Sequence, residues 1–159
     1  MPVIHVTTKI NAPVGVCFDL SRSIDLHKIS TAHTNEEAVA GVTSGLINLH
    51  ETVTWRATHF GVKKLLTTKI TGFNAPYFFR DEQLSGAFKY FIHDHHFEES
   101  KGITTMKDVF DFKSPYGFLG VIFNKIILTN YMKALLVKRN SVIKQFAESD
   151  KWKKIITQI

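Results

Sequence analysis

Two histidines and one aspartate have the residue types and the spacing for acid–base chemistry. His93 and His95 are two residues apart, so their imidazoles share one face of an extended strand. Asp108 lies on the same face of the next predicted strand as apolar residues. A neighbouring carboxylate fixes the tautomer of an imidazole and raises its pKa. His93 and Asp108 are therefore candidate catalytic residues, and the alternative is a buried hydrogen-bonded pair.

The turn between these two strands decides which residues meet. The segment 99–102 reads Glu-Ser-Lys-Gly, which is typical of a short hairpin turn. With Ser100 and Lys101 as the turn residues, His93 is predicted to lie opposite Asp108. Cross-strand neighbours of this kind are about 5 Å apart at Cβ. The carboxylate is then expected to raise the pKa of His93 if it outweighs the burial of the ring, which lowers that pKa.

The inward faces of these strands combine aromatic side chains with a few polar groups, which is typical of a pocket lining. The residues predicted to bind a ligand are Trp55, Phe79, Asp81, Gln83, Phe91, His93, His95, Met106, Asp108 and Phe110. His93 and His95 also have the spacing of half a metal site, but no third and fourth ligands are evident. We therefore expect no metal and no cofactor.

Two further residues have weaker signals. Cys17 has no neighbour in the sequence that would lower its pKa, so we expect a small core residue. His27 lies in a predicted short helix and is either a surface residue or a residue at the cavity entrance.

Composition indicates one globular domain over residues 1–159. A single cysteine excludes an internal disulfide and fits a reducing compartment, so we expect a cytoplasmic protein. No signal peptide or membrane-spanning run is evident. The net charge is +6, and no nucleic-acid motif accompanies it. Much of this charge lies in the C-terminal segment, as a solvated helix face or, alternatively, a surface that contacts an anionic membrane. Its basic residues are Lys138, Arg139, Lys144, Lys151, Lys153 and Lys154.

The spacing of hydrophobic residues along the sequence divides the chain into a β-rich part and a helical part. Alternation with period two predicts strands over 3–10, 36–42, 46–58, 62–73, 77–83, 88–99 and 103–112. Two short helices are predicted over 14–20 and 21–30, and one long helix over 118–149. This order predicts an α+β protein with a curved seven-stranded antiparallel sheet. The long helix crosses the concave face and leaves a cavity, as in the helix-grip fold.

Several segments resemble the SRPBCC superfamily, which includes START domains, birch-pollen-allergen-like proteins and polyketide cyclases. Within it, they are similar to a bacterial ligand-binding subgroup that is sometimes labelled cell-division inhibitor. The segments are 25–27, 41–46, 51–55, 59–61, 79–83, 93–97 and 108–115. The resemblance implies an internal cavity, but it carries over no catalytic residue set, and the superfamily includes both carriers and enzymes.

Two classes of function follow. The first is a carrier or sensor of a small hydrophobic ligand, such as a lipid, a polyketide or an aromatic molecule, oriented by the polar residues of the wall. The second is a cyclase, dehydratase or hydrolase that uses the same cavity with His93 and Asp108 as acid or base. The absence of a recognisable serine nucleophile turn favours the carrier. Oligomeric state is not specified by these patterns.

Overall fold

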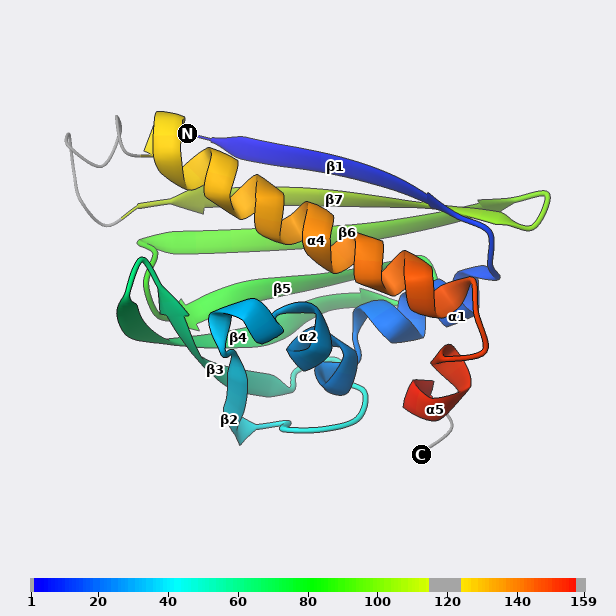
Figure 1. Cartoon of the computed structure of the whole chain (residues 1–159), viewed down its shortest axis with the longest axis horizontal. Helices are drawn as coiled ribbons and strands as arrows, with labels where there is room; N and C mark the ends of the chain where they lie inside the picture. The colour runs from blue at the N-terminus through cyan, green and yellow to red at the C-terminus, as the bar shows by residue number, and fades with distance from the viewer. Residues whose placement is uncertain (1, 115–123, 157–159) are drawn as a thin grey trace.

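The computed structural model describes residues 2–114 and 124–156 and contains a seven-stranded antiparallel sheet (Figure 1). The strand order is β1-β7-β6-β5-β4-β3-β2, so the first two strands of the chain form the two edges of the sheet. The strands are β1 (Val3–Ile10), β2 (Glu37–Gly41), β3 (Thr52–His59), β4 (Val62–Asn74), β5 (Phe78–Ser85), β6 (Tyr90–Ser100) and β7 (Ile103–Lys113). The predicted sheet is confirmed.

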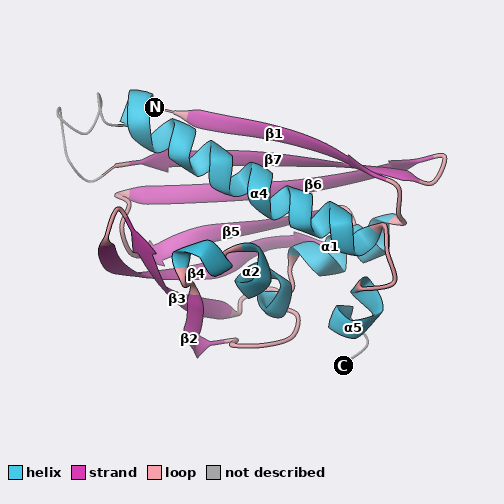
Figure 2. Cartoon of the chain, viewed as in Figure 1, coloured by secondary structure: helices cyan, strands magenta, loops and turns pink. Residues whose placement is uncertain are grey.

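The helices lie on one face of this sheet (Figure 2). A long helix crosses the sheet diagonally, and two short helices lie beside it. The helical segments are α1 (Val14–Ser21), α2 (Ile24–Ser30), the 3-10 turn η1 (Ala32–Thr34), the π-helical turn η2 (Asn124–Leu128), α4 (Thr129–Ala147) and α5 (Trp152–Ile156). The helix-grip architecture is therefore confirmed. Residues 118–123 of the predicted long helix lie outside the described residues. None of the helices in the described part of the chain combines the length and apolarity needed to cross a membrane.

Strand β3 begins six residues later than the alternation of 46–58 predicts. His50 has a φ of 68°, which is left-handed and interrupts an extended strand. The Glu51 carboxylate accepts a hydrogen bond from the backbone N–H of Asn48 at 2.7 Å and closes a turn instead. Residues 46–51 therefore form a loop ahead of the strand.

The β6–β7 register differs by two residues from the predicted one. Lys101 and Gly102 form the turn, with φ values of 53° and 77°. A two-residue hairpin turn with positive φ at both positions matches the twist of the strands, and glycine adopts it without strain. Ser100 therefore pairs with Ile103, and His95, not His93, lies directly opposite Asp108. A shift of two keeps every side chain on its predicted face.

Phe18 packs helix α1 against the sheet. It is 1% exposed and makes edge-to-face contacts with Phe73, Phe79 and Phe97, at centroid distances of 5.4, 5.6 and 5.5 Å. Such pairs contribute about 0.5–1.5 kcal/mol each beyond area burial. This aromatic cluster closes one end of the space between helices and sheet.

Cys17 is fully buried beside this cluster, and burial is the main cause that raises the pKa of its thiol to about 11. Because the fold favours the neutral thiol, its contribution to stability is complete below the pKa of the unfolded thiol and is lost as pH rises through about 11. We expect the native protein at pH 8 to react with a thiol reagent at least about 100-fold more slowly than the unfolded chain. Absorbance-monitored modification with and without denaturant checks this expectation, and equal rates would contradict it.

Candidate functional site

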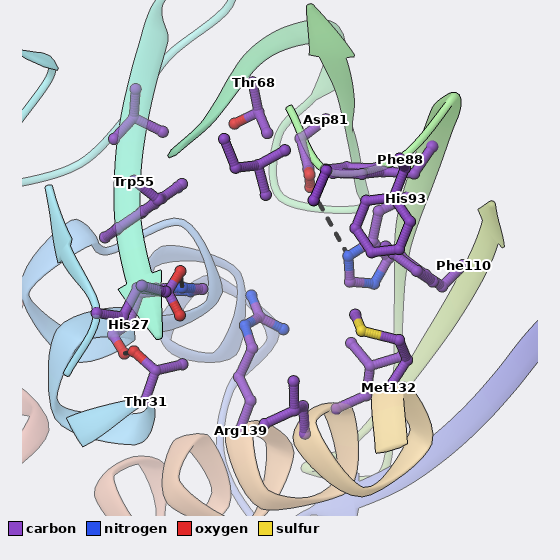
Figure 3. A pocket seen from close by; sticks show the side chains of 18 of the residues that line it. His27, Thr31, Trp55, Thr68, Asp81, Phe88, His93, Phe110, Met132 and Arg139 are labelled. Carbon is purple, nitrogen blue, oxygen red and sulfur yellow. Dashed lines mark hydrogen bonds and ion pairs between the residues drawn. The ribbon is translucent and has the colours of Figure 1, made fainter. Parts of the chain in front are cut away.

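A cavity of about 350 Å³ lies between the sheet and helices α2 and α4 (Figure 3). Most of its lining is apolar or aromatic and includes Val53, Leu66, Ile70, Phe88, Met132 and Leu136. The lining also includes the exposed residues Phe60, Val62 and Lys64, so the cavity reaches the surface beside the β3–β4 hairpin. This volume is near the lower end of the range for small-molecule sites.

Seven of the residues predicted to bind a ligand line this cavity. They are Trp55, Phe79, Asp81, Phe91, His93, His95 and Phe110. The period-two alternation of β3, β5, β6 and β7 turns all seven toward the helices. Their contact with a ligand stays a prediction.

The other three predicted residues do not line the cavity. The Gln83 side chain donates to the Phe88 carbonyl at 2.7 Å and accepts from the Phe88 N–H at 3.2 Å, so it closes the β5–β6 connection. Met106 is covered by α1, where the Ser21 hydroxyl donates to its sulfur at 3.3 Å. Asp108 is 1% exposed and lies behind the two histidines. Met106 and Asp108 do lie on the predicted inner face of β7. Helix α1 covers Met106, and the two histidine rings cover Asp108.

Asp108 supports both histidines from behind. Its Oδ1 accepts a hydrogen bond from His93 Nε2 at 3.0 Å and lies 2.9 Å from His95 Nδ1. His95 Nδ1 makes no hydrogen bond among the described residues, so its contact with Asp108 is an ion pair that forms when the imidazole is protonated. Oδ2 accepts from Asn140 Nδ2 of α4 at 2.6 Å. The predicted contact between His93 and Asp108 therefore exists, although the two residues are diagonal neighbours.

Asp81 lies on the cavity side of the same histidines. Its Oδ2 is 2.9 Å from His95 Nε2 and 3.9 Å from His93 Nδ1. Figure 3 shows Asp81 and His93 directed toward each other across the wall. Each imidazole therefore has one ring nitrogen on Asp108 and the other near Asp81. The two rings are 3.8 Å apart between centroids.

Burial decides the direction in which the pKa of His93 shifts, which the sequence left to the balance between the carboxylate and desolvation. Burial and the charge of His95 lower the pKa of His93, and together they outweigh the hydrogen bond with Asp108. Burial also disfavours a charged His95, but its contacts with Asp108 and Asp81 outweigh burial and raise its pKa. Burial raises the pKa of Asp108, yet the two histidines hold it well below its usual range. His95 is thus the imidazole that is favoured to carry a proton.

Helix α4 contributes two polar residues that sequence analysis missed. Arg139 was assigned to the solvated basic face, but it is 8% exposed and lines the cavity (Figure 3). Its Nη2 donates to the Ser21 carbonyl at 2.7 Å, and its Nη1 lies 3.8 Å from Asp108 Oδ1. Asn140 is 1% exposed. The sequence does contain a feature that indicates their burial. Both residues lie three or four positions from the apolar Leu136 and Ile143, so they share one face of the helix with them.

A second polar group lies at the other side of the cavity. His27 Nε2 is 3.0 Å from Glu36 Oε1, and the His27 ring lies over Trp55 at 4.3 Å between centroids. Burial raises the pKa of Glu36, but the charge of His27 and its hydrogen bond outweigh burial, so the pKa is lowered and the carboxylate is favoured. His27 therefore lies on the cavity wall and not on the outer surface.

A hydrogen bond joins the β3–β4 hairpin to the first turn of α4 beside the exposed cavity residues. His59 Nδ1 is 2.7 Å from the Tyr131 hydroxyl, and the Phe60 ring is 4.6 Å from the Tyr131 ring. We expect Tyr131→Phe to accelerate ligand exchange about fivefold, because removing one such hydrogen bond costs about 1 kcal/mol. Stopped-flow release of a fluorescent cavity probe measures the rate. The matched control is Tyr77→Phe at an exposed tyrosine outside the cavity lining, and equal rates in all three proteins would contradict the role of this bond.

Comparison with solved structures places this arrangement in a known fold class. A protein from Thermus thermophilus superposes with a TM-score of 0.70 at 15% identity, over 89% of this chain and 97% of that one. A START superfamily protein from Mycobacterium smegmatis gives 0.69 at 11% identity, over 91% and 98%. Major latex-like protein 151 from Panax ginseng gives 0.67 at 13% identity, over 93% and 98%. No protein-family model matches the chain, and no curated protein matches it either.

The chain has the helix-grip fold of START and major latex-like proteins. The fold that the resemblance to the SRPBCC superfamily implied is therefore confirmed. At 11–15% identity the likeness concerns architecture, so the function has to be argued from the site itself.

Proposed function

We propose that this protein binds a small, mainly apolar molecule in the cavity and acts as its carrier or sensor. The supporting observation is an apolar cavity of about 350 Å³ into which a few polar groups converge on one wall. Burial of apolar ligand surface supplies affinity at about 25 cal/mol per Å². The polar groups orient the molecule and supply specificity.

The polar wall favours a ligand with one polar or acidic end. Arg139 Nη1 is buried and has no hydrogen-bond partner among the described residues, so a ligand oxygen beside the guanidinium would relieve the cost of its burial. Nδ1 of His93 faces the same wall and accepts a hydrogen bond from a hydroxyl when Nε2 donates to Asp108. Medium-chain acyl compounds and compounds with one or two aromatic rings fit the size and this polarity.

The enzymatic alternative rests on one geometric observation. His93 contacts the buried Asp108 through Nε2 and presents Nδ1 toward the cavity, which is the arrangement of an oriented general base. Under this alternative, His93→Gln abolishes turnover of a cavity substrate and leaves its binding within about tenfold. If the variant keeps its fold and its binding, and no turnover is found for the wild-type protein either, the carrier is supported.

Native mass spectrometry of the purified protein tests the proposal first, because a cavity of this kind is expected to retain a molecule from its host. The delipidated protein is then titrated with the fluorescent probe ANS, followed by displacement with decanoic acid. We expect one probe per chain and complete displacement. Absence of a retained molecule together with non-saturating probe binding would refute the proposal.

A further inference from the structure

We propose that Asp81, His93 and His95 form a binding site for a divalent first-row transition-metal ion at the cavity wall. The proposal goes beyond the proposed function, because burial of an apolar ligand does not require a metal. From the sequence we expected no metal, since only two histidines with suitable spacing were evident. The pairing of β5 with β6 places a third donor beside them, because Asp81 lies opposite His93 in the sheet.

The three donor atoms lie close enough together for small side-chain shifts to bring them onto one metal ion. One donor atom from each residue lies within 4.8 Å of the other two. Asp81 Oδ2 is 2.9 Å from His95 Nε2 and 3.9 Å from His93 Nδ1. Metal–ligand bonds of about 2.0–2.2 Å place neighbouring donor atoms roughly 3.0–3.5 Å apart. Side-chain adjustments of less than about 1 Å therefore suffice.

Asp108 provides the support that metal-bound histidines usually have. Metal-ligating imidazoles generally donate their second ring nitrogen to a carboxylate or carbonyl, which fixes the tautomer and the ring orientation. Here one buried oxygen, Oδ1 of Asp108, lies 3.0 Å from His93 Nε2 and 2.9 Å from His95 Nδ1. Asn140 holds the other oxygen at 2.6 Å. Asp108 therefore holds His93 by a hydrogen bond and His95 by a close ionic contact, and the remaining nitrogen of each ring lies toward Asp81.

The donor set indicates the class of ion. Two imidazoles and one carboxylate are the protein ligands of open zinc sites and of the facial triad of non-haem iron(II). All three residues line the cavity, so the remaining coordination positions face it. Arg139 lines the same cavity and adds positive charge, which suits an anionic oxygen as the next ligand. Zinc(II) and iron(II) sites of this kind both hold a divalent ion with open coordination positions, and experiment distinguishes the two metals.

The test uses the full chain without a polyhistidine tag, stripped with a chelator and titrated with cobalt(II). We expect visible absorption that saturates at one cobalt per chain and disappears when zinc(II) is added. Anaerobic titration with iron(II) in competition with cobalt, and metal analysis of the protein as purified, show which ion the site prefers. Either ion at one equivalent supports the site.

Substitutions of the proposed ligands test whether the cobalt absorption comes from this site. Asp81→Ala and His93→Ala are each expected to weaken cobalt binding by more than about 100-fold, because loss of a direct ligand exceeds the 10- to 100-fold effect of losing an outer partner. His96→Ala is the matched control, since His96 is the next residue on β6 but is exposed on the other face. Circular dichroism verifies the fold of each variant, and Asp81→Asn replaces Asp81→Ala if that variant unfolds.

Two results would overturn the proposal. One is the absence of stoichiometric cobalt, zinc and iron(II) binding to the folded wild-type protein, which would leave Asp81, His95 and Asp108 as a charge-balancing network. The other is cobalt binding that survives both ligand variants or is lost with His96→Ala. Neither result affects the proposed apolar ligand, because ANS binding to the same samples measures that separately.

Discussion

Replacing Asp108 with alanine is expected to lower the free energy of unfolding by about 3–5 kcal/mol. Removing one partner from a buried ionic network leaves the others uncompensated, and this is the cost found for such changes. Here the loss affects His93, His95 and Asn140 at once, since their side chains contact this carboxylate at 3.0, 2.9 and 2.6 Å. Urea unfolding followed by circular dichroism gives the free energy.

Asp111→Ala is the control for this prediction. Asp111 is on the same strand but on the other face, half-buried, and its carboxylate accepts a hydrogen bond from the Tyr90 hydroxyl at 3.3 Å. Its replacement is expected to cost about 1 kcal/mol or less. A loss at Asp108 no larger than the loss at Asp111 would show that the buried network does not stabilise the fold.

Filling the cavity from strand β3 is expected to abolish ligand binding without unfolding the protein. Ala57 is 6% exposed and lines the cavity, so the ring of Ala57→Phe enters the space that a ligand needs. Because that space is open, the larger side chain avoids the overpacking that penalises such changes in filled cores. We expect the affinity for ANS to fall at least about 100-fold, or about 2.7 kcal/mol. Fluorescence titration and thermal unfolding measure the two effects together.

The same substitution at an exposed alanine provides the comparison. Ala40→Phe adds an equal side chain on edge strand β2, outside the cavity lining, and is expected to leave ANS affinity within about twofold. If Ala57→Phe remains folded and binds ANS as tightly as wild type, the probe binds elsewhere and the cavity is not the ligand site.

The sequence by itself determined the fold class and which strand residues face the helices. The change from period two to helical spacing after residue 115 separates the sheet from α4, because side chains alternate along strands but recur every 3.6 residues on helices. The same alternation put Phe79, Asp81, His93 and Phe110 on the inner face. These properties are local, so a single chain is enough to predict them.

Register and long-range contacts were decided only by the tertiary structure. The β6–β7 register depends on which two residues of 99–102 tolerate positive φ, and the choice of Lys101 and Gly102 shifted the pairing by two. Arg139 carries the same charge as its exposed neighbours, and only the packing of α4 over the sheet turns it into the cavity. Asp81 of β5 contacts His95 of the neighbouring strand β6, although the residue directly opposite Asp81 is His93. Such contacts join residues far apart in sequence, and their geometry follows from how sheet and helix pack, which no local pattern records.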